Sequence, residues 1–235
     1  MPGAVRFTTG TDYYTNTATT PTATFTVTCW ACLRVDRNTY TSLWAISGSG
    51  ATSNNDLTVE TDVDGTTMKL WATAGFSVAG QAMTVDTWYR FGVAKSGTTA
   101  TLYYGPATGA LTTTTRATLA TSVVTEVAIG SFRIAGAGGE FLNGSLAAFK
   151  VWNGVALTAA EIAAELTQYN PVQRANLQRY YSFAGGPQTG DESGNGFTLT
   201  PGAAAATLDP NGPPIPIAIE PQIQPYTARR RAAIW

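Results

Sequence analysis

The sequence predicts an all-β protein, built as a sandwich of two antiparallel sheets with one short helix and an extended C-terminal tail. Only 12% of the 235 residues are charged, although 44% are hydrophobic. Threonine, serine, alanine and glycine take the place of the missing charged residues. Threonine suits strands because its branched Cβ fits a pleated surface. The 24 glycines and 12 prolines are typical of many short strands joined by turns. Sandwiches of this length are commonly single domains.

Alternation of apolar and polar residues predicts most of the strands. A Thr-rich loop containing Tyr13 and Tyr14 is expected between the first two strands, and a Ser96-Gly97 turn is expected to join two others. The expected strands are 5–7, 25–35, 41–47, 57–63, 68–72, 88–95, 100–104, 127–135, 145–152, 177–183 and 197–199.

One hairpin turn and one helix have specific local signals. Asp64-Gly65 predicts a type I′ turn, whose two central residues both need a positive φ. Thr158 and Glu161 form a capping-box pattern, in which each side chain pairs with the other residue's backbone amide at the start of a helix. Pro171 is expected to end this helical region, because proline restricts the residue before it.

The composition changes at residue 201, which predicts a sandwich over residues 1–200 and a proline-rich extended tail over residues 201–235. Repeated prolines remove ladder donors and favour polyproline geometry. We expect the tail to dock on a partner, although a tail folded along its own domain stays an alternative. The expected docking residues are Pro214, Ile215, Pro216, Ile217, Ile219, Arg229, Arg230, Arg231 and Trp235.

Several classes of function are disfavoured by composition. The chain has no histidine and a net charge of −1, which removes histidine-based catalysis and metal sites and gives no field to attract nucleic acid. No apolar run is long enough to cross a membrane, and the N-terminus lacks the pattern of a signal peptide. Cys29 and Cys32 lie three residues apart on an expected strand, so their thiols should face opposite sides and stay buried and unpaired.

The order of motifs resembles the LamG-like, or concanavalin A-like, jelly-roll superfamily over about residues 1–200. The stretch that carries the resemblance most specifically consists of Asn143-Gly144-Ser145-Leu146, Val151-Trp152-Asn153 and Leu157-Thr158-Ala159-Ala160-Glu161-Ile162. The segment Asp191-Glu192-Ser193-Gly194-Asn195-Gly196 is similar to one often found beside such domains in bacterial and phage surface proteins. The resemblance implies two face-to-face antiparallel sheets and leaves the chemistry open, because the fold hosts lectins, adhesion modules, hydrolases and virion proteins.

Three acids offer an enzymatic alternative. Glu60, Asp62 and Asp64 would share one face of a strand, with spacing suited to a pair of glycosidase carboxylates. Some hydrolases of the superfamily carry a Glu-x-Asp-x-Glu strand, whereas here the last acid is aspartate at the start of a turn. We favour a solvated hairpin face over a catalytic site, so no catalytic residue is predicted.

The expectation for cofactors is none, with Ca²⁺ as the ion to consider. Calcium needs six or more oxygen ligands, and the oxygen-rich loops are Asn54, Asn55 and Asp56, and Asp191, Glu192 and Asn195. The resemblance implies an acid directly after the G-x-L segment, and this position is Ala147 here, with Ala148 beside it. No metal site is therefore predicted.

A glycan-binding surface is predicted on weaker grounds. Trp30, Trp88 and Trp152 stand at positions that the resemblance assigns to the core. Trp44 and Trp71 lie on the opposite side from their apolar neighbours and could offer a ring to a sugar, although core packing is the more frequent role of a tryptophan. The candidate glycan-binding residues are Trp44, Trp71, Asn54, Asn55 and Asp56.

These observations predict a non-enzymatic virion structural protein, such as a capsid decoration, head-fibre or tail-associated protein, that displays a lectin-like jelly roll. Its expected partners are other virion proteins, with a host-surface glycan and a second copy of the chain as further candidates, and neither membrane nor nucleic acid. The expected location is the virion, which is extracellular after host lysis. The alternatives are a lectin-like adhesion module and, less favoured, a glycoside hydrolase.

Overall fold

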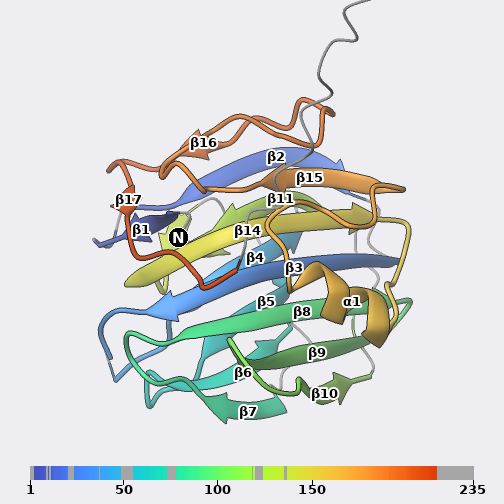
Figure 1. The fold of residues 1–235 in the computed structure, drawn as a ribbon, viewed down its shortest axis with the longest axis horizontal. Helices are drawn as coiled ribbons and strands as arrows, with labels where there is room; N and C mark the ends of the chain where they lie inside the picture. The colour runs from blue at the N-terminus through green and yellow to red at the C-terminus, as the bar shows by residue number, and fades with distance from the viewer. Residues whose placement is uncertain are drawn as a thin grey trace, which may run out of the picture.

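The computed structural model shows two antiparallel sheets packed face to face around a common core (Figure 1). This arrangement confirms the predicted all-β jelly-roll sandwich. The structure describes residues 3–8, 10, 12–20, 24–36, 38–48, 55–72, 78–117, 119, 124–134 and 137–215.

The first sheet contains eight described strands. In spatial order seven of them are β10 (Thr112–Arg116), β9 (Thr99–Pro106), β8 (Trp88–Ser96), β3 (Thr24–Leu33), β14 (Gly144–Asn153), β1 (Ala4–Phe7) and β17 (Thr207–Asp209). The eighth, β15 (Leu177–Tyr181), also pairs with β14.

The second sheet contains seven described strands. Their order is β16 (Thr200–Pro201), β2 (Tyr14–Thr20), β11 (Val124–Ile129), β4 (Ser42–Gly48), β5 (Asn55–Thr61), β6 (Thr67–Trp71) and β7 (Val78–Ala82). A separate hairpin of β12 (Phe132–Ile134) and β13 (Ala137–Gly139) contacts β4 and β5.

Alternation along β3 assigns its side chains to two different layers. Val27 and Cys29 belong to the main core between the sheets, whereas Trp30 and Cys32 belong to a smaller cluster on the outer side. Both cysteines are buried and free, as expected from their spacing. Burial raises the pKa of both thiols, that of Cys32 to about 12.

β14 forms two different pairs along one edge, separated by a bulge. Its first half pairs with β1 and its second half with β15, and its pairing with β3 shifts between Ala147 and Lys150. Ala148 has a φ of 49° and its amide donates to Ser182 O at 2.9 Å. Ala147 and Ala148 therefore lie at a buried bulge.

The capping box predicts the helix correctly. α1 (Ala159–Glu165) begins at Thr158, whose side chain accepts from the Glu161 amide while the Glu161 carboxylate accepts from the Thr158 amide. The helix packs on β8, where Gly92 leaves room for Ile162. Among the described residues, no helix has the length and apolar character needed to cross a membrane.

The Thr-rich segment after β1 corrects the sequence prediction. It is not a loop, because β2 begins at Tyr14 and pairs with β11 and β16. The expected strand 127–135 is also wrong as one element. Gly130, with a φ of 80°, separates β11 from β12, and an added Cβ there would lie 2.7 Å from the Phe7 ring.

Two local expectations near turns also differ from the structure. Only Gly65 of the Asp64-Gly65 pair has a positive φ, and its amide donates to Asp62 O. The turn is therefore centred one residue earlier than a type I′ turn would be. The expected strand at 197–199 is not formed, and β16 follows it at Thr200. The strands β7, β10, β13 and β17 were not predicted.

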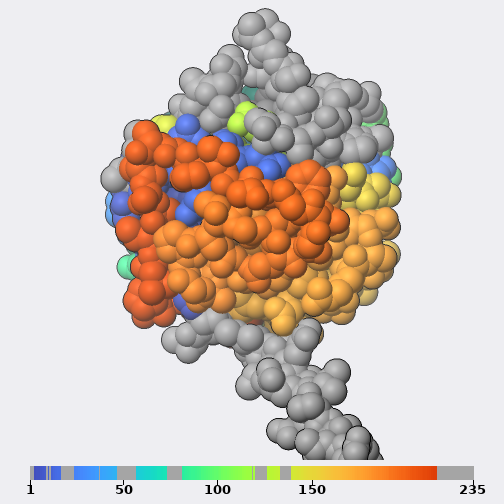
Figure 2. All heavy atoms as spheres, turned by 90° about the horizontal axis from the view of Figure 1, so that it is seen from above, coloured from blue at the N-terminus to red at the C-terminus, as the bar shows by residue number. Residues whose placement is uncertain are grey.

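The segment after residue 200 belongs to the sandwich up to residue 215, which corrects the predicted boundary. Its strand β17 pairs with β1, Asp209 accepts from Arg34 Nη2 at 2.5 Å, and Ile215 is buried near Trp30. Trp88 Nε1 donates to Asn211 O at 2.9 Å. Figure 2 shows the C-terminal part of the described chain, in orange and red, as a continuous layer over one side of the molecule.

Candidate functional site

A pocket of about 310 Å³ lies on the outer side of the second sheet. Leu57 and Val59 of β5 point into the core, so Glu60 faces outward. Lys69 and Trp71 of β6 face the same way, because Met68 and Leu70 fill the core. We call this feature the aromatic pocket, and it is lined by Tyr40, Glu60, Lys69, Trp71, Phe132 and Glu140.

Three aromatic rings form the walls of the aromatic pocket. Trp71 and Phe132 meet edge to face, with ring centroids 5.3 Å apart and planes at 74°. Trp71 is partly exposed and Tyr40 is 38% exposed, whereas Phe132 is buried. The pocket therefore offers aromatic surface that a ligand can still cover.

Charged groups form the floor of the aromatic pocket. Lys69 Nζ lies 3.1 Å from Glu60 Oε1, 3.5 Å from Asp62 Oδ1 and 4.0 Å from the centroid of the Tyr40 ring. The Ser42 hydroxyl donates toward Glu60 Oε2 at 3.5 Å and toward Glu140 Oε2 at 3.4 Å. Two carboxyl groups thus meet at a single buried serine, and the Lys69 ammonium lies against one of them.

Burial changes the ionisation of this floor. Glu60 is only 3% exposed. This burial, together with the nearby Glu140 carboxylate, raises the pKa of Glu60 to about 8, and Lys69 offsets part of the increase. At neutral pH Glu60 is therefore largely protonated, and a protonated carboxyl can donate a hydrogen bond as well as accept one.

Sequence reasoning missed four residues of the aromatic pocket, which are Tyr40, Lys69, Phe132 and Glu140. Glu140 follows β13 with a φ of 47°, and its carbonyl accepts from the Ser42 amide at 2.7 Å. None of the four missed residues belongs to a recognisable motif. A non-glycine residue with positive φ at the end of a hairpin cannot be read from the sequence.

The predicted glycan-binding residues do not lie together in the structure. Trp71 lines the aromatic pocket. Trp44 is 1% exposed and packs edge to face on Phe149 in the main core, so it cannot contact a glycan. The pairing of β4 with β5 shifts between Ser42 and Trp44, which explains why Leu43 and Trp44 both enter the core.

The other predicted glycan-binding residues cannot be placed in a site. Asn54 lies outside the described residues. Asn55 and Asp56 lie on β5, and the positions of their side chains are outside the described part of the chain.

The three acids of the hydrolase alternative have three different environments. Glu60 is buried and Asp62 is partly exposed, and both approach the Lys69 ammonium. Asp64 is exposed and accepts from the amides of Thr66 and Thr67, which lowers its pKa. The expectation of a solvated hairpin face is therefore wrong for Glu60 and correct for Asp64.

The second candidate calcium loop is held by protein hydrogen bonds. Asp191 accepts from the amides of Tyr180, Ser193 and Phe197. Glu192 accepts from the Ser182 amide at 2.8 Å. These carboxylates thus fasten the loop to β15 and the segment that follows it.

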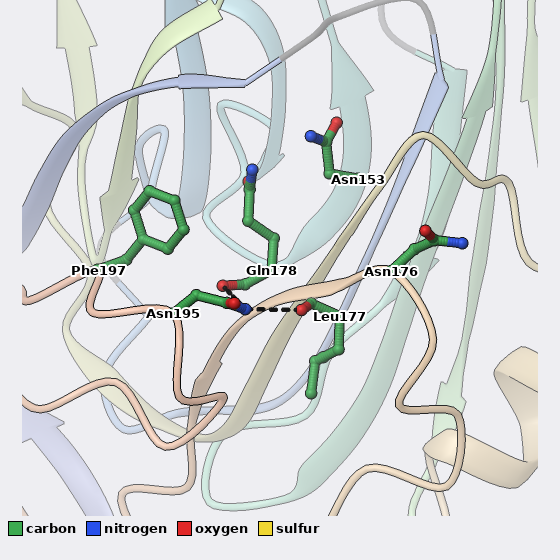
Figure 3. Close-up of a pocket in the computed structure, with 6 residues that line it drawn as sticks. All are labelled: Asn153, Asn176, Leu177, Gln178, Asn195 and Phe197. Carbon is green, nitrogen blue, oxygen red and sulfur yellow. Dashed lines mark hydrogen bonds between the residues drawn. The ribbon is translucent and has the colours of Figure 1, made fainter.

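Amide side chains line a second hollow of about 430 Å³, which we call the amide groove (Figure 3). It lies where the end of β14, the start of β15 and the loop before β16 meet. Its lining residues are Asn153, Asn176, Leu177, Gln178, Asn195 and Phe197.

Most of the predicted docking residues lie outside the described part of the chain. Pro214 is exposed and Ile215 is buried against the sandwich, so Ile215 packs on its own domain. The docking residues outside the described range are Pro216, Ile217, Ile219, Arg229, Arg230, Arg231 and Trp235.

Solved structures share this fold although sequences do not reveal it. No family model matches the chain, and no curated protein matches it. A candidate carbohydrate-binding protein from Bacteroides ovatus superposes with a TM-score of 0.62 at 14% identity, over 94% of this chain and 62% of that one. This chain thus spans less than two thirds of that protein.

Two further structures resemble the chain. A heptameric pentraxin of the serum amyloid P type from Limulus polyphemus has a TM-score of 0.56 at 14% identity, over 88% of this chain and 94% of its own. Tailspike protein 2 of the Escherichia coli O157:H7 bacteriophage CAB120 has a TM-score of 0.53 at 17% identity, over 72% of this chain and 25% of its own. The chain therefore has the lectin-like jelly-roll fold that these proteins share.

Proposed function

We propose that this chain is a non-enzymatic carbohydrate-binding jelly-roll module that holds a sugar residue in the aromatic pocket. The observation that carries the proposal is the joining of Trp71 and Phe132 with Glu60, Glu140 and Lys69 in one cavity of about 310 Å³. Ligand sites combine apolar walls with a few convergent polar groups, and this volume falls at the lower end of their range.

The groups of the aromatic pocket match the two kinds of surface on a sugar ring. The partly exposed Trp71 ring can cover the C–H face of a pyranose, and its contact with Phe132 fixes its orientation. Glu140 can accept hydrogen bonds from the hydroxyl groups of a sugar, and Lys69 can donate to them. The protonated Glu60 can do both. The similarity in fold to a candidate carbohydrate-binding protein supports this choice of ligand class.

The arrangement of the acids favours binding over hydrolysis. A glycosidase needs two carboxyl groups on either side of the bond that breaks. Here Glu60 and Asp62 approach the same ammonium of Lys69. Two carboxyl groups held against one ammonium lie side by side rather than on either side of a bond, so these acids are better suited to hold a ligand.

A glycan array with the purified chain tests the proposal. We expect the wild type to bind a restricted set of glycans, and Trp71→Ala to bind them at least about tenfold more weakly, because stacking surface is lost. Tyr103→Ala is the matched control, since Tyr103 is a partly buried aromatic residue on the other sheet, and its binding should equal that of the wild type. Equal binding by Trp71→Ala, or release of reducing sugar by the wild type, would contradict the proposal.

A second candidate function is a structural role in a virion, with the jelly roll displayed and the C-terminal tail as its anchor. The resemblance to a phage tailspike protein over 72% of this chain favours it. The heptameric pentraxin supports self-association as part of such a role. The two functions are compatible, since a virion protein can also bind a host glycan.

Particle incorporation tests the structural role. Virions assembled with the full chain are compared by electrophoresis with virions assembled with a chain ending at residue 215, which keeps every described contact of the sandwich. We expect only the full chain to be incorporated. Incorporation of the shortened chain at the same level would remove the anchoring role of the tail.

A further inference from the structure

The amide groove is lined without any charged side chain, which distinguishes it from the aromatic pocket. It is built from carboxamides on three separate segments, together with Leu177 and Phe197 (Figure 3). Carboxamides both donate and accept hydrogen bonds. Such a wall matches neither an anion nor a cation, but it matches a neutral ligand rich in hydroxyl groups.

Asn153 has a polar atom without a hydrogen-bond partner in the described part of the chain. Its Oδ1 is buried and has no hydrogen-bond partner among the described residues. Its backbone amide donates to Asn176 O at 3.0 Å, which holds the residue at the end of β14. A buried acceptor without a partner costs free energy, and a turn of the side chain toward the groove, which Asn153 lines, would let a ligand hydroxyl remove this penalty.

Asn195 contributes a second acceptor in a fixed orientation. Its Nδ2 donates to Leu177 O at 2.9 Å, to Gln178 O at 3.1 Å and to Ser193 Oγ at 3.0 Å. The hydrogen bonds described for this side chain all use Nδ2, so Oδ1 is available to accept from a ligand. Because the amide is already held in place, little conformational entropy is lost when a ligand binds.

Phe197 supplies the apolar surface of the amide groove. The Arg179 guanidinium lies 4.3 Å from the centroid of its ring. Arg179 is fully buried and donates to Asn16 Oδ1 at 3.3 Å. The cation therefore covers one face of a partly exposed ring, and the ring is held with its remaining surface toward the groove.

We propose that the amide groove is a second ligand site, separate from the aromatic pocket, which binds a neutral sugar through hydroxyl donors to Asn153 and Asn195 and through an apolar contact with Phe197. The inference rests on the proposed function for the class of ligand alone. The two sites share no lining residue, so an experiment can disprove binding at one site without affecting the other.

Side-chain amide signals in NMR spectra test the second site directly. The probes are the methyl glycosides of glucose, galactose and mannose, titrated into the ¹⁵N-labelled full chain. We expect at least one glycoside to shift the NH₂ signals of Asn153 and Asn195 along a saturable curve. Trp71→Ala should leave these shifts unchanged, because it alters only the aromatic pocket.

Substitution of Asn153 separates binding from folding. Asn153→Ala removes an acceptor that has no partner among the described residues, so it should fold normally while affinity at the groove falls roughly tenfold or more. Asn153→Leu, which keeps the volume of the side chain, should behave alike. Gln81→Ala is the matched control, because Gln81 is an exposed amide on β7.

Each possible outcome either supports or overturns the second site. Shifts of the Asn195 signal that persist unchanged in folded Asn153→Ala and Asn153→Leu would overturn the inference, as would the absence of any shift with all three glycosides. Shifts of the Trp71 indole signal alone would overturn the second site and leave the proposed function intact. Shifts at the amide groove alone would support the second site and count against the aromatic pocket.

Discussion

Lys69 Nζ lies 3.1 Å from Glu60 Oε1 and binds it across neighbouring strands at the floor of the aromatic pocket. The same ammonium faces the Tyr40 ring and reaches Asp62. It lowers the pKa of Glu60, but burial and the Glu140 carboxylate raise it by more. The pocket therefore holds a proton at neutral pH that an exposed pair of glutamates would release.

Glu60 makes the stability of the protein depend on pH. Its pKa is raised from the ordinary value of 4.5 to about 8, so the folded chain binds this proton more tightly than the unfolded chain. The contribution of Glu60 to the free energy of unfolding is fully present below about pH 4.5, and it is lost as the pH rises through about 8. Glu60→Gln should flatten this dependence, which urea unfolding across the pH window measures. An equal slope for the variant and the wild type would contradict the assignment.

Lys150 and Glu165 form a second ion pair that is buried more completely, with Nζ and Oε2 2.9 Å apart and both side chains 1% exposed. Lys150 also donates to the carbonyls of Glu165 and Gln168, and burial lowers its pKa to about 8. Lys150→Met should destabilise the fold by about 3–5 kcal/mol, because it leaves a carboxylate buried without its partner. Lys150→Met/Glu165→Leu should cost less in urea unfolding than Lys150→Met alone. A double variant that is less stable than the single one would show that the pair itself stabilises the fold.

Local patterns predicted the parts of the fold that local interactions decide. β3 and β14 follow the alternation of their residues, and α1 follows the capping box of Thr158 and Glu161. β2 could not be predicted in this way. Tyr14 and Asn16 are buried because β11 and β16, from distant parts of the chain, pair with the strand.

The candidate site could likewise be predicted only where local patterns decide it. The face of Trp71 follows from the alternation with Met68 and Leu70, and the structure places it there. Glu140 reaches Glu60 only because the β12–β13 hairpin packs on β4 and β5. The burial of Trp44 depends on an irregular register between β4 and β5. Neither a long-range contact nor a register shift leaves a pattern in the sequence.

Gly92 permits the contact between α1 and β8. A Cβ at this position would lie 2.5 Å from Ile162 Cγ2, and this methyl group is held by the helix. Gly92→Ala should therefore cost about 1–3 kcal/mol, as expected for an overpacked contact. Gly185→Ala is the control, since a Cβ there meets nothing within 4 Å, and it should change stability by less than about 0.5 kcal/mol. Equal midpoints of urea unfolding for the two variants would show that the helix moves away without cost.

The segment 200–215 should be needed for stability rather than for docking. It adds β17 beside β1, covers Trp88 through Asn211, and places Asp209 against Arg34 and Ser145. A chain ending at residue 215 keeps all of these contacts and should unfold cooperatively, near the temperature of the full chain.

A chain ending at residue 199 tests the same segment from the other side. It leaves Arg34 without its buried carboxylate and exposes the outer edge of β1, and an unpaired strand edge favours association. We expect it to unfold at a clearly lower temperature in circular dichroism, and to aggregate. Equal unfolding temperatures for the two shortened chains would restore residue 200 as the end of the sandwich. A lower temperature for the chain ending at residue 199 alone means that deletions designed to test docking must begin after residue 215, because earlier ones would report on folding.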